Sequence, residues 1–226
     1  MKFFSNKREE GLSVEKMGKS KSKSIDVNNL GQIQAGIKTG QEPLTINNVK
    51  LPFKLLDFWK WSASDLVSNA TRGVFAEYIV ATATNANMNV PRAEWDAYDL
   101  LTPDGIKIEV KSAAYIQTWA QKTYSKISFA IKQSHVKDAE TEIYSNTIKR
   151  DPVIYVFCLL NTRDEVCINP LDMEQWEFFI ITTKEIDILF TKKKSVSLKL
   201  LQEKNVFPVK YPEIYKEIKR KASQCI

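Results

Sequence analysis

The chain has 226 residues, which is enough for one domain with a substantial core or for a domain with a tail. Its composition, 43% hydrophobic and 27% charged, is ordinary for a globular protein, and no apolar run approaches the roughly 20 residues that span a bilayer. The net charge of +6 is compatible with a polyanionic partner but does not establish one. These values favour a protein with no membrane segment.

The amino terminus and the cysteines indicate a cytoplasmic setting. Residues 1–8 carry no apolar stretch after the basic residues, so they do not form a secretory signal. Cys158, Cys167 and Cys225 are an odd number without paired spacing, and the single histidine, His135, stands among polar residues. A zinc site and a histidine-based nucleophile are therefore not expected.

Residues 1–50 differ in composition from the rest of the chain. They hold the alternating Lys-Ser run at 19–24, most of the glycines and few large apolar side chains. Such a segment buries too little apolar surface to offset its ordering entropy, which predicts a flexible basic tail, or an arm that contacts phosphates or a partner. The folded domain is predicted to span 51–226. The aromatic residues at 51–61 could stack on bases, but we expect them in the core or in an interface.

The first half of the domain is predicted to contain one helix and two strands. A helix capped by Ser68 or Asn69 is apolar on almost every side, as expected for burial against a sheet. Its one acidic residue, Glu77, shares a side with small residues and faces either water or a site. Strands over 93–101 and 106–113 flank a turn at 102–105 that has Pro and Gly where a type I turn needs them.

The second half completes an α/β pattern. We expect a helix over 113–124, a strand over 125–131, a polar loop or exposed helix over 132–147, a strand buried on both faces over 152–160, a strand over 176–182, and helices over 183–190 and 212–222. This order predicts a central mixed sheet flanked by helices.

The strand over 106–113 carries the chemistry. Glu109 and Lys111 are two residues apart and leave the same face about 7 Å apart. A carboxylate there suits Mg²⁺, and a neighbouring lysine can orient water and stabilise charge on a phosphoryl group. The carbonyl of Val110 can add a metal ligand. A solvent-facing ladder of Lys107, Glu109 and Lys111 is the alternative interpretation.

With an acidic strand before it, this pattern resembles the PD-(D/E)xK, or restriction-endonuclease-like, nuclease superfamily, through Asp99, Glu109 and Lys111 over about residues 72–131. Glu77 is similar to the helical glutamate of archaeal Holliday-junction resolvases. Gln121 with Tyr124 is similar to the Gln-x-x-(x)-Tyr element of RecB-like nucleases, with a spacing one residue shorter. Tyr98 stands where the superfamily motif has proline, as in many members. Similar runs also occur in an uncharacterised bacterial branch.

The resemblance implies a restriction-endonuclease-like core and Mg²⁺- or Mn²⁺-dependent cleavage of phosphodiester bonds, usually in DNA. It implies catalytic roles for five residues and metal ligation by Asp99, Glu109 and Glu77, to which the Val110 carbonyl would add a ligand. The catalytic candidates are Asp99, Glu109, Lys111, Glu77 and Gln121. Many relatives cut as dimers, so a homodimer stays open.

The choice between Asp96 and Asp99 depends on the register of the two strands. If Leu101 pairs with Ile106, Asp96 faces Lys111, whereas a shift by one residue brings Asp99 to that face. The superfamily habit of an aspartate followed by two apolar residues favours Asp99.

Several side chains around the site could bind nucleic acid. Gln117 and Gln121 would share one face of the predicted helix, and Trp119 could stack on a base. Further candidates are the basic residues Lys107, Lys122 and Lys126. The leading hypothesis is thus a Mg²⁺-dependent endodeoxyribonuclease. The alternatives are a catalytically silent binding module on the same fold and a scaffold protein.

Overall fold

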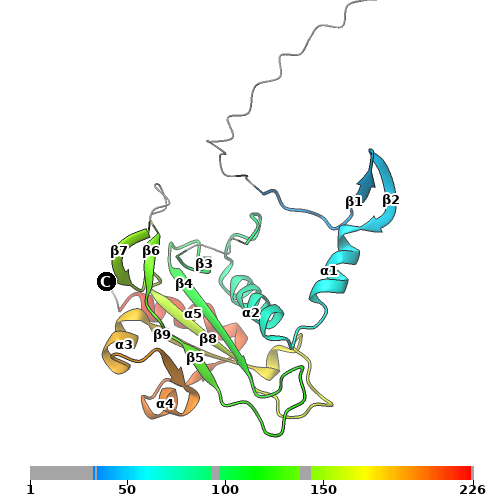
Figure 1. Ribbon diagram of the computed structural model, residues 1–226. Coiled ribbons are helices and arrows are strands. Elements are labelled where there is room, and N and C mark those ends of the chain that lie inside the picture. Colours follow the sequence, from blue (N-terminus) through cyan, green and yellow to red (C-terminus); the bar gives the residue numbers. More distant parts are fainter. Residues whose placement is uncertain (1–32, 34, 93–96, 138–143, 225–226) are drawn as a thin grey trace, which may run out of the picture. The chain divides into compact units, whose positions relative to one another are not determined.

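A computed structural model describes residues 33, 35–92, 97–137 and 144–224 (Figure 1). The chain divides into two compact units, Met1–Gln34 and Ala35–Ile226. Of the first unit only Ile33 is among the described residues, and every element below belongs to the second. No described helix has the length and apolarity needed to cross a membrane.

A mixed sheet of five strands forms the centre of the second unit and confirms the predicted α/β class (Figure 1). Strands β4 and β8 pair in parallel, and the remaining neighbours are antiparallel. In sheet order the strands are β11 (Pro208–Val209), β9 (Trp176–Thr182), β8 (Ile154–Leu160), β4 (Lys107–Ala114) and β3 (Leu100–Leu101).

The central strand β8 explains why its sequence is continuously apolar. All seven of its residues are buried, because both faces of the sheet are covered. On one face, Val156 and Cys158 pack with α2 (Asn69–Thr84) and α5 (Ile214–Ala222). On the other face, Tyr155 and Phe157 pack with α3 (Thr183–Leu189) and α4 (Leu198–Glu203).

The helix boundaries follow from local capping and patterning. Thr182 accepts a hydrogen bond from the Glu185 backbone N–H, and the Glu185 side chain returns one to the Thr182 N–H, so α3 begins with a capping box. In α5, Ile214 and Ile218 are buried one turn apart. The basic residues of its last turn interact favourably with the negative end of the helix dipole. The predicted helices over 183–190 and 212–222 are therefore confirmed.

The turn between β3 and β4 also forms as predicted. The Gly105 N–H donates to the Thr102 carbonyl at 2.9 Å, and the Ile106 N–H donates to the Thr102 hydroxyl at 3.0 Å. Gly105 has φ +76°, a conformation that costs glycine little and other residues more.

The predicted helix over 113–124 is wrong. β4 continues to Ala114 and a loop follows, in which the Gln117 N–H donates to the Gln121 side chain at 2.7 Å and the Ser125 N–H donates to the Tyr115 carbonyl at 2.9 Å. In a helix these backbone N–H groups would donate to carbonyls four residues earlier. Here one donates to a side chain and the other to a carbonyl that closes the loop. Aromatic and β-branched residues in this stretch also weaken helix propensity.

The polar segment after residue 131 also differs from the prediction. It forms β6 (Ser134–Lys137) and β7 (Tyr144–Lys149), which pair as antiparallel strands, where a loop or exposed helix was expected. The strand expected over 125–131 exists as β5 (Ser128–Ala130) but pairs with β10 (Ser195–Ser197) outside the central sheet. Of the strand expected over 93–101, residues 93–96 lie outside the described residues.

Residues 43–63 form a small module that begins within the predicted tail. The strands β1 (Pro43–Ile46) and β2 (Val49–Lys54) are joined by Asn47 and Asn48, both at positive φ, as a type I′ turn requires. Helix α1 (Leu55–Ala63) follows directly and buries none of its residues, so the expectation that these aromatic residues fill the core is wrong. Two short 3₁₀ helices, η1 (Met173–Gln175) and η2 (Tyr211–Glu213), complete the described elements.

Candidate active site

The register of β3 and β4 brings Asp99 to the Glu109 side of the hairpin. Leu101 pairs with Lys107, and Leu100 pairs with Ile108. The connection between the strands is therefore one residue longer than in the alternative in which Leu101 pairs with Ile106. The Asp99 N–H donates to the Ile108 carbonyl at 3.0 Å, one residue out of step with the observed pairs, so the chain bulges at the start of β3 and the Asp99 carboxylate lies 3.9 Å from Lys111. Asp96 lies outside the described residues.

Asp99, Glu109 and Lys111 form one half-buried cluster. The Lys111 ammonium contacts the Glu109 carboxylate and lies 3.9 Å from Asp99 Oδ2. About a third of the Lys111 side chain is exposed, and about a fifth of each carboxylate side chain. The predicted common face of Glu109 and Lys111 is therefore confirmed, and water can reach the cluster from one side.

Backbone groups of Val110 help to build the same cluster. The Val110 N–H donates to Asp99 Oδ2 at 2.7 Å, so the carboxylate is held against the strand by a charge-assisted hydrogen bond. In a strand, the N–H and C=O of alternate residues point to the same edge, and Ile108 directs its carbonyl to Asp99. The Val110 carbonyl consequently points to the edge where Asp99 lies.

The cluster carries more negative charge than its lysine compensates. Burial raises the pKa of Glu109, and the charge of Asp99 raises it further, while Lys111 acts in the opposite direction. A carboxylate in this environment is stabilised by additional positive charge. This donor set, two carboxylates with a backbone carbonyl beside them, fits a hard cation such as Mg²⁺ that keeps several waters.

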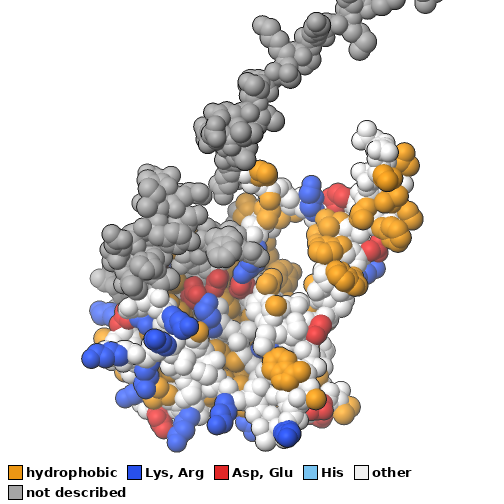
Figure 2. Space-filling model, in the orientation of Figure 1, with side chains coloured by type: hydrophobic (Ala, Val, Ile, Leu, Met, Phe, Trp, Pro, Cys, Tyr) orange, Lys and Arg blue, Asp and Glu red, His pale blue; other side chains and the backbone are white. Residues whose placement is uncertain are grey.

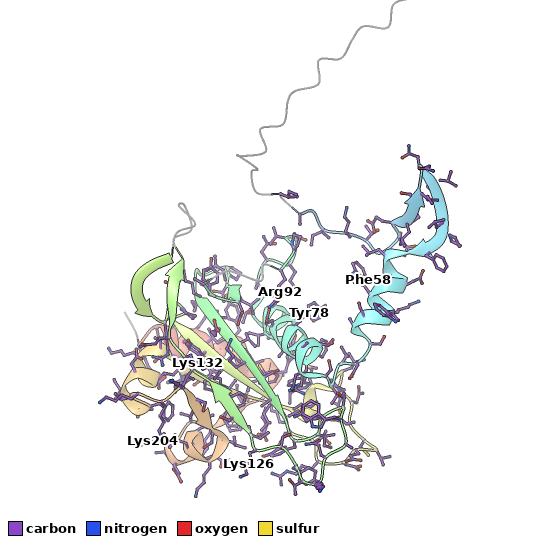
Figure 3. All side chains as sticks on the ribbon, viewed as in Figure 1. Phe58, Tyr78, Arg92, Lys126, Lys132 and Lys204 are labelled. Carbon is purple, nitrogen blue, oxygen red and sulfur yellow. The ribbon has the colours of Figure 1, made fainter. Side chains whose placement is uncertain are left out.

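Glu77 lies nearby but is already engaged. Its carboxylate contacts the Arg92 Nε, and the Arg92 Nη2 donates to Glu77 Oε1 at 2.9 Å. Figure 3 labels Arg92, which lies near α2. Its charge still reaches the site, because it contributes to raising the pKa of Glu109. Within the described ranges, no three acidic, histidine or cysteine side chains are grouped as a metal cluster, so Glu77 does not join Asp99 and Glu109 in this arrangement.

The two glutamines organise the loop after β4. Besides its bond to Gln117, the Gln121 side chain donates to the Ser125 hydroxyl at 3.0 Å. The Gln117 side chain donates to the Ala114 carbonyl at 2.8 Å and accepts from Arg72 of α2 at 3.3 Å. These bonds give both residues a structural use that the predicted helix would not have given them.

The other candidate nucleic-acid contacts fall into two groups. Lys107 donates to Asp151 at 2.8 Å, so its charge is partly compensated. Trp119, Lys122 and Lys126 are exposed on and after the loop that follows β4.

Sequence reasoning missed Tyr155, which stands opposite Glu109 in the parallel pairing of β4 and β8. Burial raises the pKa of Tyr155, and the Glu109 charge raises it further, so the hydroxyl stays protonated beside the carboxylate. The available signal was a single tyrosine in an otherwise apolar strand. Its importance depended on a register that the sequence does not give.

The chain is similar to known endonucleases. The family model of bacteriophage T4 endonuclease IV matches residues 55–199, which include β3, β4 and β8. Among solved structures, a bacterial homing endonuclease, I-Ssp6803I, is similar at 15% identity and a TM-score of 0.36, over 70% of this chain and 99% of that chain. No curated protein matches.

Proposed function

The chain belongs to the bacteriophage T4 endonuclease IV family, and from that premise we propose that it is a metal-dependent endodeoxyribonuclease whose hydrolytic site is Asp99, Glu109 and Lys111. The observation that carries the proposal is the Lys111 ammonium held beside two half-buried carboxylates, Asp99 and Glu109. This is the arrangement of the PD-(D/E)xK superfamily, and membership of that superfamily is part of the proposal.

Each residue has a distinct role in the proposed reaction. Asp99 and Glu109, with the Val110 carbonyl, would hold one divalent cation, Mg²⁺ or Mn²⁺. When bound, the cation supplies positive charge to the phosphoryl group and lowers the pKa of a water molecule.

Lys111 orients the attacking water and stabilises the negative charge that develops on the phosphoryl oxygens. Its position between Asp99 and Glu109 holds it beside the reacting group. Glu77, bonded to Arg92, acts from outside by adding to the negative potential at Glu109. Tyr155 closes the β8 side of the site, where its hydroxyl can donate to the carboxylate or to a water.

The test is cleavage by the purified full chain of plasmid DNA, single-stranded DNA and RNA, with Mg²⁺, with Mn²⁺ and with EDTA. We expect Glu109→Gln, Asp99→Asn and Lys111→Met each to reduce cleavage at least 100-fold, because each removes charge from the reacting centre. Lys216→Met on α5 is the matched control, since this lysine is exposed and faces away from the sheet.

Calorimetry separates a nuclease from a silent binding module on the same fold. The nuclease should bind Mg²⁺ in the wild type and lose that binding in Glu109→Gln. Wild-type cleavage in both Glu109→Gln and Lys111→Met would refute the assignment of the site. Cleavage of RNA alone would refute the assignment of the substrate.

A further inference from the structure

A hollow of about 680 Å³ lies on the sheet face that carries Glu109 and Lys111, between the end of β5, Arg150 directly after β7, and the connection from α3 to β10. Five of its lining residues are cationic and one is acidic. The lining residues are Lys132, Gln133, Arg150, Asp187, Phe190, Thr191, Lys192, Lys193 and Lys194.

The hollow is held in shape by hydrogen bonds. Arg150, with 6% of its side chain exposed, donates to the Ile131 carbonyl at 2.6 and 3.1 Å and contacts Asp187. The Ile131 N–H donates to the Lys194 carbonyl at 3.0 Å. The lysine run is therefore fixed to β5, and the one acidic lining residue is already bonded to an arginine.

The hollow and the candidate active site are connected through β4. Arg150 lines the hollow and is followed by Asp151, which accepts a hydrogen bond at 2.8 Å from Lys107, two residues before Glu109 on β4. Successive residues of a strand rise about 3.3 Å, so one nucleic-acid strand can reach both places. Figure 2 shows lysine and arginine side chains gathered on this face, and Figure 3 places Lys132 and Lys126 there.

We propose that this hollow binds backbone phosphates of the substrate beside the scissile bond. The proposal rests on the proposed nuclease function and extends it to residues 132 and 192–194, which the sequence did not single out. Lysine is a compact point charge suited to phosphate. The one aromatic lining residue, Phe190, is 1% exposed, so the hollow offers no surface on which a base could stack.

The experiment measures DNA binding by fluorescence anisotropy between 50 and 300 mM salt, in a Glu109→Gln background that prevents cleavage. The hollow variant is Lys193→Gln with Lys194→Gln, and the control is Lys216→Gln with Lys219→Gln on α5. We expect the hollow variant to bind at least tenfold more weakly at low salt, with a slope of log K against log salt reduced by about 2, since each duplex phosphate contact contributes about 0.9.

The outcomes separate this proposal from the nuclease assignment. Equal binding and equal slope in the hollow variant and the control, with the wild type cutting DNA, would overturn the phosphate site and leave the nuclease in place. A wild type that neither binds nor cuts DNA would overturn both. Weaker binding with an unchanged salt slope would show that the lysines do not contact phosphates, which also overturns the proposal.

A second inference comes from the module of β1, β2 and α1. Seven large hydrophobic side chains of this module are exposed: Leu44, Ile46, Val49, Phe53, Phe58, Trp59 and Trp61. On the hairpin they alternate with Lys50 and Lys54, and Ile46 pairs with Val49 across the strands, so one face is apolar. On α1, the Phe58 and Trp61 rings lie 6.4 Å apart. Figure 2 shows hydrophobic side chains on both the hairpin and α1, and Figure 3 labels Phe58.

Such a module is too small to be stable with its apolar face in water. A single two-stranded hairpin is marginal, and so is an isolated nine-residue helix that buries none of its residues. Its internal packing is limited to contacts such as Trp59 against Gly40, where a Cβ would meet the ring at 2.9 Å. Burial against another surface would supply the missing stabilisation.

We infer that this face joins two copies of the chain. At about 200 Å² for each aromatic residue, Phe53, Phe58 and Trp61 expose on the order of 400 Å². The three aliphatic side chains bring the face close to the roughly 800 Å² per partner of a stable interface. A polyanion would instead contact the lysine-bearing face, and the apolar side chains of residues 1–34 are dispersed among charged and polar residues.

The test is the mass of the full chain in solution by light scattering and sedimentation, from 1 to 100 μM. We expect a dimer for the wild type and a monomer for Phe53→Lys with Trp61→Lys. Val166→Lys, at an exposed valine outside the module, is the control and should remain a dimer. A monomeric wild type over the whole range, or a dimer that survives both lysines, would overturn the inference. Circular dichroism of the double variant verifies that the central domain still folds.

Discussion

Lys111→Met gives the most direct test of the site's electrostatics, because the change keeps the length of the side chain and removes its charge. At an effective dielectric constant of about 20, a unit pair at the 3.9 Å that separates Lys111 from Asp99 has a Coulomb energy of about 4 kcal/mol. Desolvation and the partial exposure of all three side chains offset much of this. Without Lys111, the charges of Asp99 and Glu109 would repel each other, since the Asp99 charge already raises the pKa of Glu109.

The expected loss in the free energy of unfolding is about 2 kcal/mol at pH 7.5 without divalent metal. The loss depends on pH with a fixed sign. The pKa of Glu109 is already raised in the folded protein, and removal of Lys111 raises it further. A carboxyl with a raised folded-state pKa stabilises the fold below its unfolded value and loses that contribution as the pH rises through the folded value. The deficit of Lys111→Met should therefore be small near pH 4 and grow towards pH 8.

Urea denaturation followed by circular dichroism, at pH 4, 6 and 8 with and without Mg²⁺, measures these quantities. Because a divalent cation replaces the missing charge, Mg²⁺ should recover at least half of the deficit at pH 8. Lys216→Met should match the wild type under every condition. A Lys111→Met protein with wild-type stability at pH 8, or a deficit that shrinks with rising pH, would refute the reasoning.

Three further predictions concern the fold around the site. Trp176→Phe should lower the free energy of unfolding, measured by urea denaturation, by about 2–3 kcal/mol. The buried indole N–H donates to the Pro170 carbonyl at 2.9 Å, and its removal leaves an unpaired acceptor beside a small cavity. A loss below about 0.5 kcal/mol would contradict this reasoning. Gly105→Ala should cost about 1–2 kcal/mol through backbone strain alone, since an added Cβ meets no atom within 4 Å, and an unchanged melting temperature would argue against the positive φ. Cys158 is buried, and burial raises the pKa of its thiol, so iodoacetamide at pH 8 should leave it unmodified in the native protein and label it in urea. The exposed Cys167 should be labelled under both conditions. Mass spectrometry of the peptides measures the labelling of each cysteine.

The strongly patterned elements were predictable because their cause is local. The β8 run is apolar at every position, the α3 cap needs Thr182 and Glu185 three residues apart, and the turn at 102–105 needs its Pro and Gly. Alternation alone places Glu109 and Lys111 on one face of β4, and their contact confirms it. No knowledge of the rest of the fold enters these predictions.

The loop after β4 failed to follow the helix prediction for a tertiary reason. The Gln117 and Gln121 side chains take backbone hydrogen bonds that a helix would make internally, and Arg72 of α2 holds Gln117 from a distance of 45 residues in the sequence. The strand β5 likewise lies outside the central sheet, because it pairs with Ser195–Ser197, which is far along the chain. Contacts of this kind are not encoded in a local pattern.

By itself, the sequence determined the α/β class, the strand with Glu109 and Lys111, and the acidic segment before it. Only the tertiary structure decided that the Asp99 carboxylate lies 3.9 Å from Lys111, because one residue in the hairpin connection reverses every side chain on the strand. It also decided that Tyr155 lies beside Glu109, that Arg92 binds Glu77, and that the residues of α1 remain exposed. These features depend on contacts between segments that are distant in the sequence. Such contacts determine which side chains are buried, which charges are compensated and which residues stay exposed.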